Sequence, residues 1–425
     1  MNIYIFGLGH IGLPLACWLA LTEENNKVIG IDINEVNINK IKNGTINIEE
    51  YYKGTHLASL AKGLIDSGKL SVNTEFNRID KLNSVFILCI GMADRLDGTK
   101  DLAPILTAID TIKSTISDGD LIILRSTLVP GTCENYIIPR LKQAEKQFYF
   151  AYCPETIIET RAFEELENNE LIIGAIDEES FMTAKNFFES ISHCSITRSP
   201  DIKTAELAKV IQNIHRDVNI ALANEISDIA SQLNVDFYEL QKLVNKNPRV
   251  ELLAAGPGVG GYCLPNALGY LQLALSESGS NNLIITKLAR KLNTERPSKV
   301  FELVQKALNN NHKTVEGSVI AVTGLAMKDY CADCRISPAL DLIALLKKHG
   351  AIVKTFDPLV QDDYPFKAVS FEECIRNADC LVIMAKQEAL KYPYDLLTKY
   401  LKDPPIIVDT RNVVGNNPDI KLYRL

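Results

Sequence analysis

The N-terminal stretch up to Asp32 holds the pattern that most constrains the fold. A short apolar run leads into residues 7–12, which read Gly-Leu-Gly-His-Ile-Gly. Residues 13–21 then carry apolar side chains at helical spacing, and residues 27–32 form a second apolar run that ends in Asp32. Strand, G-x-G-x-x-G, helix, strand and a carboxylate about 20 residues further on are the parts of a dinucleotide-binding βαβ unit. We therefore expect the chain to begin with a Rossmann-like domain.

Each glycine of this motif has its own task. Gly7 makes the turn, Gly9 admits the pyrophosphate, and Gly12 lets the helix pack on the strand. The helix N-terminus faces the phosphate because its free N–H groups attract negative charge. Asp32 is expected to bond the ribose hydroxyls and to repel a 2′-phosphate, which favours NAD over NADP.

The apolar runs that follow keep an α/β rhythm and predict further strands. They cover residues 84–90, 121–124, 148–152 and 171–174. Because ligands of open α/β sheets bind at the carboxyl ends of strands, we expect Thr127, Glu155 and Glu159 to face one crevice. The alternative for these residues is a helix cap, a helix-start carboxylate and a solvated acid.

Residues 204–233 contain neither proline nor glycine and repeat apolar side chains at helical spacing. A helix of about 30 residues spans roughly 45 Å at about 1.5 Å per residue. Such a helix is expected to bridge domains or to build a dimer interface. Lys209 and Asn213 lie one turn apart on it and share a face, where a cation and an amide suit an oxyanion. The alternative is a surface lysine and a satisfied amide.

Residues 256–265 read GPGVGGYCLP and crowd glycines before Cys263. Glycine lets backbone N–H groups approach a bound group, since no Cβ intervenes. A thiol at the end of such a loop is presented to a ligand, and the thiolate is a strong nucleophile. The alternative is a tight turn followed by a buried, inert cysteine.

A second α/β pattern begins at residues 319–325. A helix is expected near residues 339–348, and strands are expected at residues 352–356, 380–384 and 406–408. Lys328, Arg335 and Arg411 follow strands of this second sheet. Basic groups at strand ends suit phosphate.

The composition excludes several classes of function. The net charge is −8, with 46% hydrophobic and 23% charged residues, so we expect neither a nucleic-acid partner nor a membrane surface. The first residues lack the features of a signal peptide, and no apolar run approaches a membrane span. Ten cysteines are scattered, Cys331 and Cys334 form a lone C-x-x-C, and six histidines show no metal spacing. We expect a reduced cytoplasmic protein without a metal.

Seven motifs in order make the chain similar to the UDP-glucose/GDP-mannose dehydrogenase family, the nucleotide-sugar 6-dehydrogenases. They are residues 7–12, Ser126-Thr127 with 130–132, Cys153-Pro154-Glu155, Ala205-Glu206-Leu207 with Lys209 and Asn213, 248–250 with 258–263, 324–328 with 335–338, and Asp409-Thr410-Arg411. The resemblance covers nearly the whole chain. Residues 216–225 and 256–261 resemble the UDP-N-acetyl-D-mannosamine branch.

The resemblance implies an NAD-dependent, four-electron oxidation of the C6 hydroxyl of a UDP-N-acetylhexosamine to the uronic acid, for surface polysaccharide precursors. UDP-N-acetyl-D-mannosamine is the favoured substrate. Cys263 would attack the intermediate aldehyde, and water activated near Thr127 and Glu155 would hydrolyse the resulting thioester. The implied catalytic residues are Cys263, Lys209, Asn213, Glu155 and Thr127. The implied cofactor-binding residues are Gly7, Gly9, His10, Ile11, Gly12, Asp32, Ser126, Thr127, Glu159 and Arg335. The implied substrate-binding residues are Arg249 (reaching across a dimer), Gly258, Gly260, Gly261, Lys328 and Arg411.

The chain departs from the family pattern at several positions. Ala267 stands where the family places an aspartate four residues after the cysteine, and Asn266 stands where a lysine is common. Met92-Ala93 replaces a Thr-Pro pair, and Ala332 replaces one of two aspartates. Two alternatives therefore stay open. One is a catalytically impaired relative that binds nucleotide sugars, and the other is a UDP-glucose 6-dehydrogenase. A two-electron β-hydroxyacid dehydrogenase would need neither Cys263 nor the last domain.

We therefore expect an α/β protein with two Rossmann-like, doubly wound domains, joined by a long central helix and a helical middle domain. The expected ranges are 1–200 for the NAD-binding domain, 201–297 for the central, dimer-forming domain and 298–425 for the UDP-sugar-binding domain. The last boundary is expected near Pro297. The expected assembly is a homodimer through the central helix.

Overall fold

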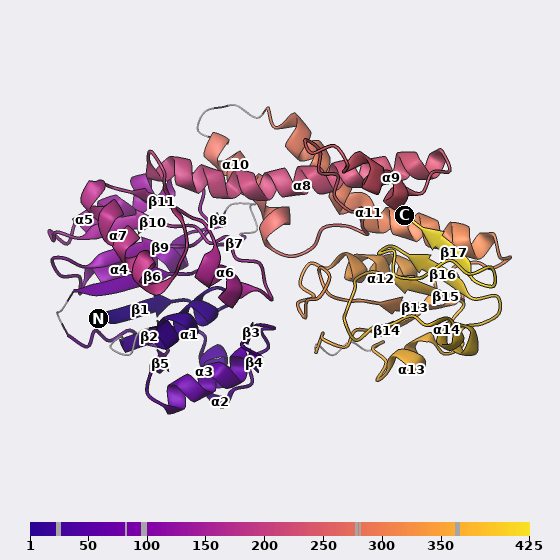
Figure 1. Ribbon diagram of the computed structural model, residues 1–425, viewed down its shortest axis with the longest axis horizontal. Helices are drawn as coiled ribbons and strands as arrows, with labels where there is room; N and C mark the ends of the chain where they lie inside the picture. The colour runs from indigo at the N-terminus through magenta and orange to yellow at the C-terminus, as the bar shows by residue number, and fades with distance from the viewer. Residues whose placement is uncertain (23–26, 81–82, 95–99, 277–278, 280–281, 362–365) are drawn as a thin grey trace. The chain divides into compact units, whose positions relative to one another are not determined.

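Figure 1 shows a computed structural model of the chain. It describes residues 1–22, 27–80, 83–94, 100–276, 279, 282–361 and 366–425. The chain divides into two compact units. The first contains Met1–Gln212 and Gly269–Asn281, and the second contains Asn213–Leu268 and Asn282–Leu425.

The first unit is built on a mostly parallel sheet. Among the described residues this sheet has eight strands in the order β12-β11-β10-β9-β6-β1-β2-β5. The strands are β1 (Asn2–Phe6), β2 (Lys27–Ile31), β5 (Leu70–Asn73), β6 (Ser84–Leu88), β9 (Leu121–Leu124), β10 (Tyr149–Tyr152), β11 (Leu171–Ala175) and β12 (Ile196–Arg198). Among the strands described for this sheet, β10 and β11 alone pair antiparallel. From β5 to β10 the order is that of a dinucleotide-binding fold, in which β1 and β6 flank the point where the strand order reverses.

Two short hairpins and the helices complete the first unit. The hairpins pair β3 (Tyr51–Tyr52) with β4 (Thr55–His56), and β7 (Ala93–Asp94) with β8 (Lys100–Asp101). The helices are α1 (Gly12–Thr22), α2 (Glu35–Asn43), α3 (Leu57–Asp66), α4 (Ala103–Lys113), the π-helical turn η1 (Cys133–Ile137), α5 (Ile138–Lys142), α6 (Ala162–Asn168) and α7 (Glu178–Ile191). Residues 12–20 of α1 are all buried, because this helix packs against β2, α3 and α6.

Helix α8 (Ile202–Gln232) is the long helix that the sequence predicted. Its 31 residues correspond to about 46 Å at about 1.5 Å per residue. The following helices are α9 (Phe237–Val244), α10 (Cys263–Ser276) and α11 (Ile284–Asn309). Pro297 lies inside α11, so the helix does not end at the expected boundary near this residue. The three domain ranges stay a prediction.

The second unit holds a parallel sheet of five strands among its described residues. Their order is β14-β13-β15-β16-β17, so the strand order reverses between β13 and β15. The strands are β13 (Val319–Thr323), β14 (Ile352–Phe356), β15 (Cys380–Ile383), β16 (Ile406–Asp409) and β17 (Lys421–Arg424), and the helices are α12 (Pro338–Lys348), α13 (Phe371–Ile375) and α14 (Tyr394–Tyr400). The prediction of two Rossmann-like sheets joined by a long helix is confirmed.

Several strands are shorter than the apolar runs that predicted them. The run 319–325 gives a strand that ends at Thr323, because Gly324 turns the chain with φ of 78°. The run 84–90 gives a strand that ends at Leu88. Along the described parts of the chain, every helix is too short or too polar to cross a bilayer.

Candidate functional site

The glycine motif of the first unit forms a close turn between β1 and α1. Gly7 has φ of 91°, and a Cβ on it would lie 2.7 Å from the carbonyl oxygen of Cys89. A Cβ on Gly12 would clash with the Gly7 carbonyl. A Cβ on Gly9, in contrast, would meet nothing within 4 Å. Gly9 therefore borders open space, where a side chain would block the approach of a phosphate.

Asp32 follows β2 and is held by the same loop. Its carboxylate accepts hydrogen bonds from the Leu8 and Asn34 N–H groups, both at 2.9 Å. Asn37 donates to it at 3.2 Å. Asp32, Gly7 and Gly9 all line a cleft of about 620 Å³ between β1, β2 and α4. This geometry fits NAD, with the phosphates at Gly9 and a ribose at Asp32.

Ser126 and Thr127 follow β9, on the same sheet. The Ser126 hydroxyl is buried and has no hydrogen-bond partner among the described residues, and Thr127 is half-buried. A buried hydroxyl without a partner is uncommon, so Ser126 suits a polar ligand. Glu206 of α8 accepts hydrogen bonds from the Gly131 and Cys133 N–H groups and anchors the next turn. Burial raises the pKa of Glu206, and these hydrogen bonds oppose the rise.

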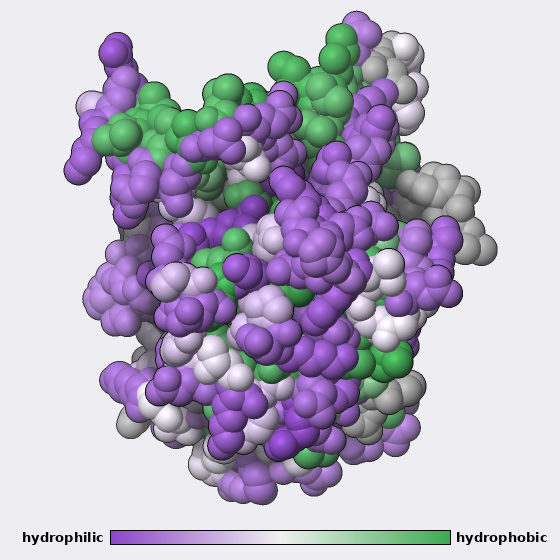
Figure 2. All heavy atoms as spheres, turned by 90° about the vertical axis from the view of Figure 1, so that its right-hand side faces the viewer, coloured by the Kyte–Doolittle hydropathy of each residue, from purple (hydrophilic) through white to green (hydrophobic). Residues whose placement is uncertain are grey.

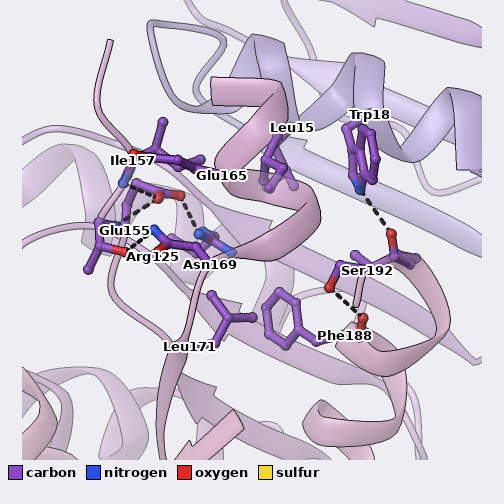
Figure 3. Close-up of a pocket in the computed structure, with 13 residues that line it drawn as sticks. Leu15, Trp18, Arg125, Glu155, Ile157, Glu165, Asn169, Leu171, Phe188 and Ser192 are labelled. Atoms are coloured by element: carbon purple, nitrogen blue, oxygen red, sulfur yellow. Dashed lines mark hydrogen bonds and ion pairs between the residues drawn. The ribbon is translucent and has the colours of Figure 1, made fainter. Parts of the chain in front are cut away.

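Glu155 forms a buried ion pair with Arg125, shown in Figure 3. The two residues follow the neighbouring parallel strands β10 and β9, which brings their side chains together. The Glu155 carboxylate also accepts hydrogen bonds from the Thr156 and Ile157 N–H groups, both at 2.7 Å. The Arg125 guanidinium lies 5.6 Å from the ring centre of Phe188. Sequence reasoning missed Arg125, although an arginine directly after a buried apolar strand needs a partner.

The loop that carries Glu159 is fixed by Glu50, a second residue that sequence reasoning missed. The buried Glu50 carboxylate accepts hydrogen bonds from the Thr160 N–H at 2.6 Å and the Ala162 N–H at 2.9 Å. Thr160 has φ of 81°, a strained value for a β-branched residue. Glu159 itself is half-buried beside it. No local pattern signals this contact, because Glu50 lies far away in the sequence.

In the second unit, the glycine loop before Cys263 packs closely on the chain between β13 and α12. A Cβ on Gly258 would lie 3.0 Å from Pro338, and one on Gly260 would lie 2.5 Å from the Ile336 carbonyl oxygen. A Cβ on Gly261 would clash with Met327. Only glycine fits these positions.

Cys263 is the first residue of α10 and is exposed, so the burial assumed by the alternative of an inert cysteine is wrong. Ala267 lies about one turn further along α10 and is only 2% exposed. Cys263 and Thr127 belong to different units.

The basic candidates of the second unit differ in their surroundings. Arg411 forms an ion pair with Asp329 and packs against Gly256, where a Cβ would lie 2.6 Å from its Nη1. Arg335 is exposed and donates from Nε to Asp333 at 3.0 Å. Lys328 and Arg249 are exposed.

Lys209 and Asn213 lie one turn apart on α8. Lys209 is half-buried, and Asn213 is buried.

Comparison with known proteins accounts for this arrangement. Three models of the UDP-glucose/GDP-mannose dehydrogenase family match in order: the NAD binding domain over residues 1–192, the central domain over residues 203–295, and the UDP binding domain over residues 321–416. The chain belongs to this family. It is an NAD-dependent nucleotide-sugar dehydrogenase.

Relatives within the family are similar over their whole length. The chain is 34% identical to the UDP-N-acetyl-D-mannosamine dehydrogenase of Methanococcus maripaludis strain C7, over 98% of this chain and 94% of that protein. It is similar in structure to UDP-D-ManNAc dehydrogenase from Pyrococcus horikoshii, with a TM-score of 0.88, 32% identity and coverage of 100% and 99% of the two chains. The UDP-N-acetyl-mannosamine dehydrogenase from Staphylococcus aureus gives a TM-score of 0.85 at 29% identity, with coverage of 100% and 98%.

Proposed function

We propose that this dehydrogenase oxidises the C6 hydroxyl of UDP-N-acetyl-D-mannosamine to the uronic acid, in the cytoplasm, for surface polysaccharide precursors. The observation that carries the proposal is the full-length similarity to UDP-N-acetyl-D-mannosamine dehydrogenases, in a chain that keeps Cys263 at the end of its glycine loop.

The first unit supplies the cofactor site. Gly7, Gly9 and Gly12 with His10 and Ile11 form the turn that holds the phosphates, and Asp32 binds the ribose. NAD, when bound, would accept one hydride per molecule, so the two oxidation steps would consume two molecules of NAD in succession. Ser126, Thr127, Glu159 and Arg335 complete the proposed cofactor contacts.

The second unit supplies the nucleophile. The C6 alcohol loses a hydride and a proton to become an aldehyde, and the Cys263 thiolate adds to the aldehyde carbon to form a thiohemiacetal. Loss of a second hydride and a proton leaves a thioester. Water then cleaves the carbon–sulfur bond, which releases the acid and restores the thiol. Lys209 and Asn213 stabilise the negative oxygen that forms at each addition.

The remaining candidates have roles in water activation and substrate binding. Thr127 orients the attacking water. Glu155, which Arg125 and two N–H groups hold in place, accepts the proton of that water. The nucleotide sugar is held by the glycine loop and by basic side chains. These are Gly258, Gly260, Gly261, Lys328 and Arg411, with Arg249 from the second subunit of a dimer.

The proposed homodimer rests on exposed apolar side chains of the second unit. Six large apolar residues on α8, directly after α8 and on α11 are 49% to 76% exposed. They are Leu222, Ile229, Leu233, Ile284, Ile285 and Leu288. Figure 2 shows apolar surface along the top of the molecule, where these helices lie in Figure 1. Large apolar side chains that gather on helix surfaces are typical of an interface between copies. Light scattering at micromolar concentration should give the dimer mass, and a monomer mass would count against this proposal.

The oxidation is tested by NADH absorbance when the protein is mixed with NAD and UDP-N-acetyl-D-mannosamine, UDP-N-acetyl-D-glucosamine or UDP-glucose. We expect the largest rise with the mannosamine sugar. The Cys263→Ser variant should form no acid while it still binds the nucleotide sugar, because serine is a poor nucleophile without a dedicated base. Equal turnover by this variant would show that the covalent route is wrong.

A second candidate function is supported by Ala267. This buried position lacks the aspartate that the family places there, so the chain has lost a group suited to proton transfer near Cys263. A relative that binds UDP-sugars but turns over slowly would give no sustained NADH rise with any of the three sugars. A burst of NADH followed by a slow phase, with a covalent adduct on Cys263 by mass spectrometry, would locate the defect in thioester hydrolysis.

A further inference from the structure

Three buried polar residues of the second unit form hydrogen bonds that lead to Gly256, the first residue of the glycine loop. They are Asn224 of α8 and Asn293 and Arg296 of α11, and each is at most 2% exposed. Buried amide and guanidinium groups destabilise a fold unless they are hydrogen-bonded. Their partners therefore show which part of the structure they hold in place.

Both backbone polar groups of Gly256 are bound by these side chains. The Gly256 N–H donates to Asn224 Oδ1 at 2.9 Å, and Arg296 Nε donates to the Gly256 carbonyl oxygen at 3.1 Å. The two contacts come from different helices, α8 and α11. Hydrogen bonds from two helices thus hold one peptide segment.

The Asn224 and Arg296 side chains are themselves fixed by further hydrogen bonds. Asn224 Nδ2 donates to Asn293 Oδ1 at 3.1 Å, and Asn293 Nδ2 donates to Asp217 Oδ1 at 2.9 Å. Arg296 Nη1 donates to Asp228 Oδ1 at 2.6 Å. The bonds through Asn293 to Asp217 orient the Asn224 amide with its oxygen toward the loop, and a chain of buried hydrogen bonds of this kind is stiff.

A third side chain, that of Arg411, lies against Gly256. A side chain on Gly256 would meet the Arg411 guanidinium, and Gly258 packs on Pro338 and Pro297. The start of the loop is therefore fixed to both helices and to the UDP binding domain, while its far end presents Cys263 at the first turn of α10.

We propose that Asn224 and Arg296 are positioning residues, which set the place of Cys263 by holding Gly256. This inference rests on the proposed function, in which Cys263 is the nucleophile. Their removal should lower kcat with little effect on the KM for NAD, because the cofactor site lies on the other unit. Loss of position by about 1 Å is enough to cost about 10²-fold in rate.

The experiment compares Asn224→Ala with Asn219→Ala. Both changes remove an asparagine from α8, but the Asn219 side chain bonds only to His215 of the same helix among the described residues. Arg296→Gln and the milder Arg296→Lys form a second pair, since lysine keeps a charge for Asp228. Circular dichroism and thermal melting select variants that remain folded. Arg296→Lys serves if Arg296→Gln does not fold.

Three readouts are measured on the full chain. Hydrogen exchange at residues 254–262 should quicken about tenfold or more in Asn224→Ala and not in Asn219→Ala, because one buried hydrogen bond is lost. The rate of Cys263 alkylation by iodoacetamide should change in Asn224→Ala and Arg296→Gln, and Arg296→Lys should lie between Arg296→Gln and the parent. For UDP-N-acetyl-D-mannosamine oxidation, kcat should fall about tenfold or more, as expected for a displaced nucleophile.

The outcomes separate this inference from the proposed function. An unchanged rate of hydrogen exchange at residues 254–262 in Asn224→Ala would show that Asn224 does not hold Gly256 in place. Faster exchange with unchanged alkylation and unchanged kcat would overturn the positioning role and leave a structural one. If the parent oxidises no UDP-sugar, the proposed function fails, and exchange with alkylation still decides whether these residues position Cys263.

Discussion

The buried pair of Arg125 and Glu155 yields a prediction about what the carboxylate does. The perturbations are Glu155→Gln, Arg125→Met and the double variant. The side chains of Arg125 and Glu155 are 2% and 9% exposed. Burial lowers the pKa of Arg125, but the charge and hydrogen bond of the Glu155 carboxylate, together with the nearby Cys153 and Cys89 thiols, raise this pKa to a net position above its ordinary value. The Arg125 guanidinium is therefore charged in the folded protein at neutral pH.

The magnitude follows from what each variant leaves behind. Removing one partner of a buried pair strands the other charge and costs about 3–5 kcal/mol. In a unit of this size each kcal/mol corresponds to roughly 2–4 °C in Tm, so either single variant should melt roughly 6–20 °C lower. The double variant leaves no charge and keeps similar volumes, and its new amide retains an oxygen for the Thr156 and Ile157 N–H groups. It should regain most of the loss.

The assays are thermal unfolding of all four proteins and kcat for the UDP-sugar. If Glu155 only positions the loop after β10, the double variant should recover kcat together with stability. If Glu155 transfers protons, the double variant should stay as slow as Glu155→Gln, since general acid–base groups contribute about 10²- to 10⁴-fold. Single variants as stable as the parent would refute the reasoning, because they would show that neither charge depends on the other.

Four further outcomes are expected. Asp32→Asn should narrow the preference for NAD over NADP about tenfold or more in calorimetry, because the charge that repels the 2′-phosphate is gone. Gly9→Val should weaken NAD binding while the melting temperature stays near that of the parent, whereas Gly12→Val should not fold, because a Cβ on Gly9 meets open space and a Cβ on Gly12 meets the Gly7 carbonyl. Glu206→Gln should remove a pH dependence of stability. Because the pKa of Glu206 is raised in the folded state, that state binds more protons than the unfolded one. The free energy of unfolding of the parent therefore falls as pH rises from the ordinary pKa of 4.5 through the raised value, and that of the variant should not. Ala267→Asp should speed the slow phase of NADH formation and lower the melting temperature, because it restores a carboxylate at a buried position; an unchanged slow phase would show that another group has taken over the proton transfer.

The elements of the fold that the sequence predicts are those whose pattern is local. The turn at residues 7–12 needs glycine whatever the rest of the chain does, because a Cβ on Gly7 would press on a neighbouring carbonyl oxygen. The long helix α8 follows from apolar spacing without a breaker. The NAD-binding domain and the order of the three family domains along the chain could be predicted for the same reason, since each motif carries its own strand, turn and helix.

Contacts between distant residues were decided only by the tertiary structure. Arg125 meets Glu155 because β9 and β10 are neighbours in register, and no periodicity within either strand encodes that pairing. Asn224 and Arg296 are polar positions of helices, and their local pattern does not show that both form hydrogen bonds to Gly256. Local patterns report which side chains are buried, but the partner of a buried polar group depends on how helices and strands pack, and that is set by the whole fold.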